Sequence, residues 1–199
     1  MKIGILGGSF DPVHNGHLNM AEKAYQEYGL DEVWLIPAGH SPNKEESRMT
    51  PADERLAMCE IAAESRDYLK ASDIEVASSE RSYTYRTLQK LKELYPEDDF
   101  YFIMGADSLD YFETWKHPEI ISSLSHILVV NRDAFREQDL LDKIAVIQKL
   151  FPADIRIVHC EKYPVSSHEI RERLFHGKDV SEWLDDKVLS YLKEQKLYE

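Results

Sequence analysis

The first twenty residues place the tightest constraint on the fold. An apolar run over 2–6 is followed at once by two glycines, and an amphipathic run starts at Leu18. This order predicts a buried strand, a tight loop and the N-terminus of a helix, with His14 and His17 at the junction. Glycine loops and helix N-termini bring backbone N–H groups to anions, and imidazoles add further donors. The stretch therefore predicts a phosphate site.

Strands and helices alternate along the rest of the chain. The pattern predicts strands over 2–6, 32–36, 73–77, 99–104, 126–130 and 154–158, and helices over 18–28, 50–65, 87–94, 117–124, 138–151, 166–176 and 183–197. Such alternation predicts an α/β fold of the Rossmann-like, doubly wound kind, with a mainly parallel sheet and helices on both faces. We expect a single domain over 1–199, with 165–199 as a small C-terminal helical part.

Polar and glycine-containing segments follow the predicted strands. They cover 7–17, 37–48, 105–108, 131–133 and 165–171. Ligands of open parallel sheets bind outside the carboxyl ends of the strands. We therefore expect these segments to form one site at that edge of the sheet.

Composition excludes several classes of partner. The net charge of -13 argues against a nucleic-acid backbone, but a small phosphorylated ligand responds to local charge. No apolar run approaches the roughly 20 residues of a membrane-spanning helix. Cys59 and Cys160 lack metal-ligand spacing, and we expect buried, reduced thiols. The sequence thus predicts a cytoplasmic protein without a membrane partner, and it is compatible with a homo-oligomer.

The segment 7–17 has two interpretations besides a phosphate site, namely a purely structural turn and a metal site. It is neither the G-x-G-x-x-G dinucleotide fingerprint nor a P-loop. A purely structural turn does not explain why His14 and His17 bracket a glycine at a helix start. A metal site would need further His, Cys or carboxylate ligands at matching spacing, and the sequence shows none. We therefore predict no metal bound by a protein cage.

Four segments resemble a known family. GGSFDPVHNGH at 7–17 resembles the HxGH signature of the nucleotidylyltransferase superfamily, in the form found in bacterial nicotinate mononucleotide adenylyltransferases. SYT at 82–84, GAD at 105–107 with Trp115 downstream, and SSHEIR at 166–171 resemble further motifs of that family, in the same order. The chain departs from the family pattern in three places: PNK at 42–44 stands for Pro-His-Lys with a histidine displaced to His40, His168 replaces a common Thr, and Arg132 is followed by Asp-Ala instead of Pro-Gly.

The resemblance implies an activity and its ligands. The phosphate of nicotinate mononucleotide would attack the α-phosphorus of ATP, giving deamido-NAD and pyrophosphate, with Mg²⁺ held mainly by phosphates and water. It implies catalytic roles for His14, His17, Lys44 and Arg171. It implies ATP contacts for Gly7, Gly8, Ser9, Phe10, Gly16, Gly105, Asp107, Arg132, Ser166, Ser167 and Ile170. It implies mononucleotide contacts for Asp11, Tyr83, Thr84, Trp115 and Lys116.

Other interpretations stay open beside these implied roles. Trp115 is alternatively a core or lid residue, Asp11 a turn residue beside proline, and Arg171 a solvated helix arginine. The same chemistry on nicotinamide mononucleotide or phosphopantetheine is the nearest alternative activity, although phosphopantetheine enzymes usually have Thr where His14 stands. A nucleotide-binding module without catalysis is the alternative from a different class.

Overall fold

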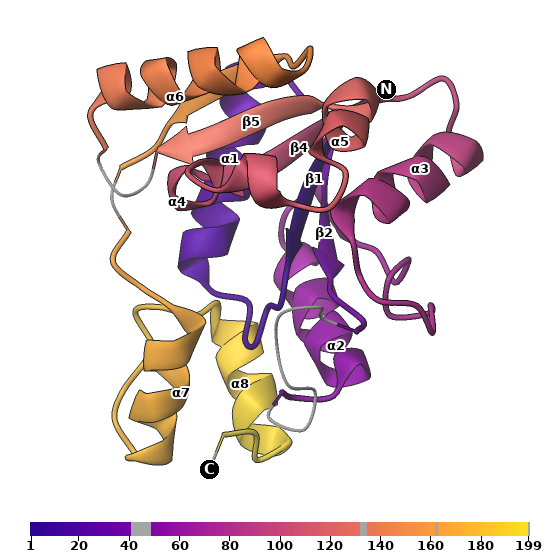
Figure 1. The fold of residues 1–199 in the computed structure, drawn as a ribbon. Helices are drawn as coiled ribbons and strands as arrows, with labels where there is room; N and C mark the ends of the chain where they lie inside the picture. Colours follow the sequence, from indigo (N-terminus) through magenta and orange to yellow (C-terminus); the bar gives the residue numbers. More distant parts are fainter. Residues whose placement is uncertain (41–48, 132–134, 162, 199) are drawn as a thin grey trace.

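A parallel sheet forms the centre of the molecule. The computed structural model describes residues 1–40, 49–131, 135–161 and 163–198. The strands are β1 (Lys2–Gly8), β2 (Glu32–Pro37), β3 (Leu69–Ala71), β4 (Asp99–Gly105), β5 (His126–Asn131) and β6 (Ile155–His159). They lie in the order β3-β2-β1-β4-β5-β6, and every neighbouring pair is parallel (Figure 1). The order reverses between β1 and β4, as in a doubly wound sheet.

Helices cover both faces of this sheet. One face carries α1 (Asn15–Tyr28) and α2 (Ala52–Ala63), to which α7 (Ser167–Phe175) and α8 (Asp186–Glu194) add their apolar residues. The other carries α3 (Thr84–Leu94), α4 (Ala106–Leu109), the 3₁₀ turn η2 (Phe112–Thr114), α5 (Pro118–Leu124) and α6 (Glu137–Leu150). Each face has its own buried core, which is why the central strands read as continuous apolar runs. The predicted fold class is confirmed.

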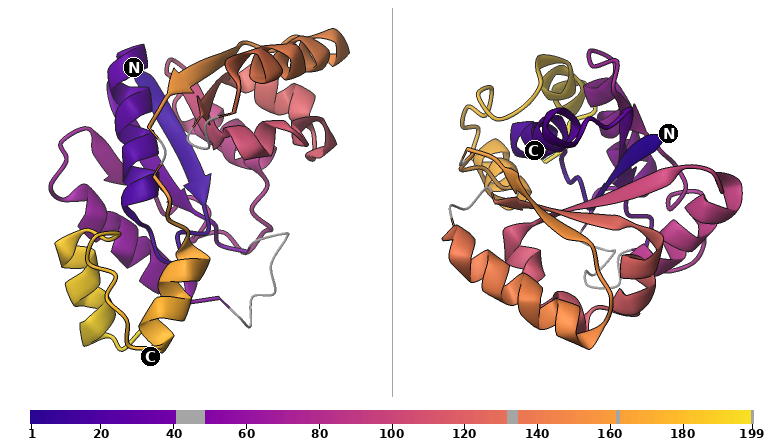
Figure 2. Two further views of the ribbon diagram at one scale, coloured as in Figure 1. Left: turned by 90° about the vertical axis from the view of Figure 1, so that its left-hand side faces the viewer. Right: turned by 90° about the horizontal axis from the view of Figure 1, so that it is seen from above.

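The C-terminal helices lie below the carboxyl end of β1, side by side in Figures 1 and 2. Ile170 of α7 and Val188 of α8 join the same core as α1 and α2. The backbone N–H of Asn15 donates to the carbonyl of Trp183 at 2.8 Å, which fixes the start of α1 against this part of the chain.

The predicted third strand is wrong. The edge strand β3 is Leu69–Ala71, which pairs with 33–35, whereas 73–77 forms a turn in which the N–H of Ala77 donates to the carbonyl of Asp73 at 2.8 Å. The alternating pattern there reflects one buried side chain, Ile74, and not a strand. A side chain at Gly39 would lie 2.2 Å from the carbonyl oxygen of Glu75, so the turn packs directly on the loop after β2.

Several boundaries also differ from the sequence predictions. Helix α1 begins at Asn15, before Leu18, because a histidine provides its N-cap. Helix α3 runs from Thr84 to Leu94, and α8 runs from Asp186 to Glu194. Helix α2 begins at Ala52, two residues after the predicted start. Cys59 is buried as expected, whereas Cys160 is only half-buried. Among the described residues, no helix combines the length and apolar character that crossing a bilayer requires.

Candidate active site

The glycines at the carboxyl ends of β1 and β4 lie at the point where the strand order reverses. Leu6 of β1 pairs with Ile103 of β4, so that Gly8 and Gly105, two residues further along each strand, end at the same edge. Parallel sheets bind ligands in the crevice outside this point. A Cβ built on Gly7 would meet no atom within 4 Å, which leaves open space above the end of β1.

A cavity of about 670 Å³ opens beside these glycines and is called the β1–α3 cavity below. Its lining consists of Gly7, Gly8, Ser9, Ala38, Glu75, Ser82, Tyr83, Thr84, Phe102, Tyr111, Thr114, Trp115, Lys116 and Ile121. The structure thus brings together four of the five residues predicted to contact a mononucleotide, from two separate parts of the chain. Asp11, the fifth, lies outside this lining.

Two walls of the β1–α3 cavity have complementary chemistry. Trp115 is half-buried, and its ring packs at 5.5 Å from the ring of Phe112 and 6.0 Å from that of Phe102. The same cavity is lined by Thr84, where α3 begins, and helix N-termini carry partial positive charge. Lys116 Nζ lies 4.6 Å from the centre of the Tyr83 ring and adds a cation. A flat aromatic wall beside a positive end fits a planar ring that carries an anionic group.

The two histidines form a stacked pair at the start of α1. Their ring centres lie 3.7 Å apart with an interplanar angle of 24°, and His14 is 2% exposed while His17 is half-buried. The backbone N–H of His14 donates to Nδ1 of His17 at 3.3 Å. Because Nδ1 accepts this bond, the neutral ring of His17 carries its proton on Nε2. The edge-on contact with Phe10, at 4.9 Å between ring centres, holds the same ring from the other side.

Gly16 is explained by the buried histidine. A Cβ at this position would lie 3.0 Å from the Cε1 and Nδ1 atoms of His14 and 3.0 Å from Val165 Cγ1. The glycine therefore leaves room for the imidazole to fold back over the first turn of α1.

The first N–H groups of α1 are less available to a ligand than expected. The N–H of Asn15 donates to Trp183, and that of His17 donates to the carbonyl of His14 at 2.8 Å. Two donors of the first turn are thus used within the protein.

The segment 166–171 packs against the loop that precedes α1. Ser166 caps α7 by accepting the N–H of Glu169 at 3.2 Å. Ser167 Oγ donates to the carbonyl of Pro12 at 3.0 Å, and Arg171 Nη1 donates to the carbonyl of Asp11 at 2.6 Å. Ile170 is fully buried beneath them. Two motifs about 150 positions apart in the sequence thus form one unit.

Asp11 faces this unit and not the β1–α3 cavity. Its side chain is buried and accepts a hydrogen bond from Tyr198 Oη at 2.5 Å, while Arg171 Nη1 lies 3.9 Å from its Oδ2. Burial and the nearby Asp11 carboxylate raise the pKa of Tyr198, so its hydroxyl stays protonated and donates. The structure does not place Asp11 as a mononucleotide contact, because its carboxylate is used to hold the C-terminal part.

The remaining predicted residues divide into two groups. Lys44 and Arg132 lie outside the described residues. Gly105 is the N-cap of α4, and Asp107 is exposed in its first turn. Within the described ranges, no group of three or more His, Cys, Asp and Glu side chains could hold a metal ion.

The histidines at the family departures serve locally. The carbonyl of His40 accepts the N–H of Ser82 at 2.9 Å. The exposed His168 lies 3.5 Å from Glu172 on its own helix.

Sequence reasoning missed Arg55, which is 2% exposed. Its guanidinium donates to the carbonyls of Thr50 at 2.9 Å, Ser9 at 2.7 Å and Ala38 at 2.6 Å. It therefore joins the residues that follow β1 and β2 to the residue that precedes α2. The buried stripe of α2 is Arg55, Met58, Cys59 and Ala62. The helical spacing of 55 to 58, 59 and 62 was the signal that could have identified this arginine.

Known proteins resemble this chain over nearly its whole length. The family model described as cytidylyltransferase-like matches residues 5–173. A relative from Clostridium botulinum (strain Okra / Type B1), named a probable nicotinate-nucleotide adenylyltransferase, is 38% identical over 195 residues, covering 98% of this chain and 97% of the relative. A relative of the same name from Lachnoclostridium phytofermentans is 34% identical over 197 residues, covering 99% and 98%.

A solved structure shares the fold. Plasmodium falciparum nicotinic acid mononucleotide adenylyltransferase complexed with NaAD has a TM-score of 0.80 at 24% identity, covering 99% of this chain and 97% of that one. The same enzyme complexed with APC gives a TM-score of 0.78. With the match of the family model and the identity to the curated relatives, this chain belongs to the cytidylyltransferase-like family, among the relatives named nicotinate-nucleotide adenylyltransferases.

Proposed function

We propose that the protein transfers the adenylyl group of ATP to nicotinate mononucleotide, giving deamido-NAD and pyrophosphate. The observation that carries the proposal is the position of the β1–α3 cavity next to the loop that ends in the histidine pair. A planar acidic ring fits the cavity, and its attached phosphate can then reach the edge of the sheet. The names of the relatives from Clostridium botulinum and Lachnoclostridium phytofermentans support the same reaction.

The acceptor occupies the β1–α3 cavity in this proposal. Its ring stacks on Trp115, and its carboxylate receives hydrogen bonds from Thr84 and from the first N–H groups of α3, assisted by the charge of Lys116. Tyr83, under Lys116, completes that wall. Asp11 has no part in this contact and instead orients the loop.

The reaction needs no covalent enzyme intermediate, because the acceptor phosphate is already an anionic nucleophile. One of its oxygens forms a bond to the α-phosphorus of ATP, the bond from that phosphorus to the bridging oxygen breaks, and pyrophosphate leaves with the electron pair. Nε2–H of His17 donates to the α-phosphate, and His14 supports the ring by stacking. The backbone of Gly7, Gly8, Ser9 and Phe10, with Gly16, lines the approach. Catalysis then rests on positioning and on charge stabilisation.

The departing pyrophosphate is assigned to the segment 166–171, which packs on the loop before α1. Ser166, Ser167 and Arg171 lie there, and Ile170 anchors the helix that carries them. The residues near Gly105 fit Mg²⁺ shared with phosphates, because the exposed Asp107 is an oxygen ligand of the kind that this ion prefers. When bound, the ion neutralises phosphate charge. Lys44 and Arg132, outside the described residues, stay predictions for phosphate and ATP contacts.

Release of pyrophosphate from ATP with a panel of acceptors tests the proposal. We expect rapid release with nicotinate mononucleotide and slower release with nicotinamide mononucleotide or phosphopantetheine, because the cavity offers donors to a ring carboxylate. Preference for phosphopantetheine would contradict the assignment. A protein that binds ATP but releases no pyrophosphate with any acceptor would be a binding module without catalysis.

A further inference from the structure

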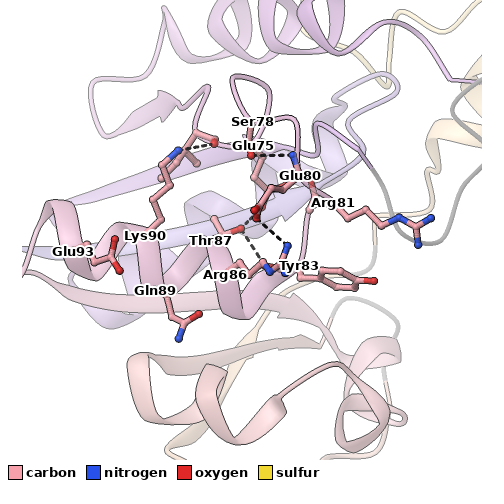
Figure 3. Close-up of a pocket in the computed structure, with 12 residues that line it drawn as sticks. Glu75, Ser78, Glu80, Arg81, Tyr83, Arg86, Thr87, Gln89, Lys90 and Glu93 are labelled. Atoms are coloured by element: carbon pink, nitrogen blue, oxygen red, sulfur yellow. Dashed lines mark hydrogen bonds and ion pairs between the residues drawn. The ribbon is translucent and has the colours of Figure 1, made fainter.

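Glu75 forms part of the wall between the β1–α3 cavity and a second pocket. This outer pocket has a volume of about 340 Å³ and lies between the turn 73–77 and α3 (Figure 3). Glu75 lines both spaces, and it is the carboxylate among the residues that line the β1–α3 cavity. A half-buried carboxylate beside a site for anionic substrates requires an explanation, because its charge opposes their binding.

Two hydroxyl groups lie beside this carboxylate. Thr87 Oγ1 donates to Glu75 Oε1 at 2.6 Å, and Figure 3 shows the two side chains reaching toward each other. Ser82 lines both spaces together with Glu75, and its hydroxyl accepts the N–H of Gly39 at 3.0 Å. Glu75 therefore connects the loop after β2, the turn 73–77 and the start of α3.

The two hydroxyl groups bracket the segment assigned to the acceptor carboxylate. Ser82 directly precedes Tyr83 and Thr84, and Thr87 lies one turn later on α3. The proton of the Thr87 hydroxyl is directed to Glu75, so the donors left for a ligand are Thr84 and the first N–H groups of the helix. An amide N–H₂ on the acceptor ring would face these N–H groups, with which it forms no hydrogen bond. A ring carboxylate needs only donors, and the wall offers them.

We propose that Glu75 is a positioning residue that selects the acceptor. Through Ser82 and Thr87 it fixes the segment 82–84, so that an acceptor ring with a carboxylate is bound in preference to one with an amide. This inference rests on the proposed function, because it concerns the acceptor of the same reaction.

The test compares Glu75→Gln with the wild-type enzyme. The amide keeps the shape of the side chain but removes its charge, and a neutral amide oxygen accepts the Thr87 hydroxyl less strongly than a carboxylate does. We expect the KM for nicotinate mononucleotide to rise about 5- to 20-fold, with kcat and the KM for ATP within about twofold. The ratio of kcat/KM for nicotinate over nicotinamide mononucleotide should fall at least about fivefold.

Matched variants separate positioning from general damage. Thr87→Val removes the hydroxyl that donates to Glu75, so it should reproduce the effect of Glu75→Gln. Thr87→Ser retains that hydroxyl and should have nearly normal kinetic constants. The double variant Glu75→Gln/Thr87→Val should be no worse than either single variant, because both break one network. Glu93→Gln, which lines the outer pocket on exposed α3 surface, is the control and should change nothing.

An unchanged acceptor KM, or equal losses in kcat and in both KM values, would overturn the inference. Amide hydrogen exchange over 82–85 in the ligand-free protein provides a measurement that needs no activity. It should be faster in Glu75→Gln and Thr87→Val and normal in Glu93→Gln. If the wild-type protein released no pyrophosphate, the proposed function would fail. The positioning role is tested separately, because amide hydrogen exchange at the wild-type rate in Glu75→Gln and Thr87→Val would exclude it.

Discussion

At the scale of single residues, the spacing of the two histidines follows from packing. Because His14 caps α1 and turns its ring back over the first turn, a Cβ two positions later would lie only 3.0 Å from that ring. The ring then stacks on His17, whose Nδ1 accepts the N–H of His14. The H-x-G-H pattern therefore describes one folded object, in which the glycine is as necessary as the imidazoles.

Substituting the glycine tests this explanation. In Gly16→Ala the new methyl group would collide with the ring of His14, so we expect kcat for pyrophosphate release to fall about 10- to 100-fold through misplacement of the histidine pair. Alanine favours a helix over glycine by about 1 kcal/mol, so the free energy of unfolding should fall little. Urea unfolding beside steady-state kinetics measures both. Normal turnover would show that the imidazoles tolerate displacement.

The raised pKa of Glu75 predicts how the stability of the protein depends on pH. Burial raises the pKa of Glu75, although hydrogen bonds from Thr87 and Ser82 and the charge of Arg55 oppose the shift. The folded protein thus retains a proton that the unfolded chain loses near the ordinary pKa of 4.5. The stabilising contribution is complete below that value and is lost as the pH rises through the raised pKa.

We therefore expect the free energy of unfolding of the wild-type protein to decline relative to Glu75→Gln between about pH 4 and pH 7. Urea unfolding of both proteins at several pH values in that window measures the difference. Parallel curves, or a wild-type protein that gains stability relative to the variant, would show that the carboxyl is not perturbed in this direction.

At the scale of elements, helix α2 serves as a support for two loops. Arg55 projects from its buried stripe and binds the carbonyls after β1 and β2, together with the carbonyl of Thr50. Burial lowers the pKa of Arg55, and the negative charge of Asp11 opposes this shift. An arginine keeps its charge under such conditions, so the three carbonyls always have a charged donor.

Arg55→Met should destabilise the protein by about 2–4 kcal/mol, because it leaves buried carbonyls without their charged partner. Arg55→Lys should restore only part of this stability, since an ammonium group cannot reach all three acceptors in the fixed geometry of the guanidinium. Urea unfolding provides the measurement. Arg136→Met, on the exposed start of α6, is the control and should change stability by less than about 0.5 kcal/mol. Equal effects of Arg55→Met and Arg136→Met would contradict the supporting role.

The sequence predicts elements well where apolar periodicity decides them. The order of strands and helices and the edge at which the polar segments meet follow from local pattern, and Tyr83, Thr84, Trp115 and Lys116 indeed share one cavity. Their contacts with a ligand stay a prediction. The strand over 69–71 was missed because a short edge strand with one buried residue has no periodicity to detect.

Other features could not be predicted from the local sequence pattern, because the residues that they contact are distant in the sequence. The roles of Arg55 and Glu75 depend on which loop lies opposite, and nothing in their neighbouring residues records it. The position of Asp11 outside the β1–α3 cavity was missed for the same reason, because its hydrogen-bond partner, Tyr198, is 187 positions away.

At the scale of the whole molecule, the fold closes on the loop before α1. The β1–α3 cavity is lined by Gly8 and Ser9 at the start of that loop, and the C-terminal part packs on residues 11–12. Ser167, Arg171 and Tyr198 all bind the segment 11–12, so the last part of the chain orients the residues that lead to His14. A second contact, from Tyr191 Oη to Glu54 at 2.6 Å, ties α8 to α2 away from that loop.

These two tyrosines allow a matched test of whether the C-terminal part acts on catalysis. Tyr198→Phe removes a donor from the buried carboxylate of Asp11, so we expect a loss of about 1–3 kcal/mol in unfolding free energy and a fall in kcat of about 3- to 10-fold. Tyr191→Phe removes a similar bond from Glu54 and should lower stability slightly while kcat stays normal. Urea unfolding and pyrophosphate release measure both variants. If Tyr198→Phe lost stability but kept its kcat, the C-terminal part would stabilise the fold without orienting the loop that leads to His14. A change in kcat confined to Tyr198→Phe would show that the contact between Tyr198 and Asp11 sets the geometry of the site.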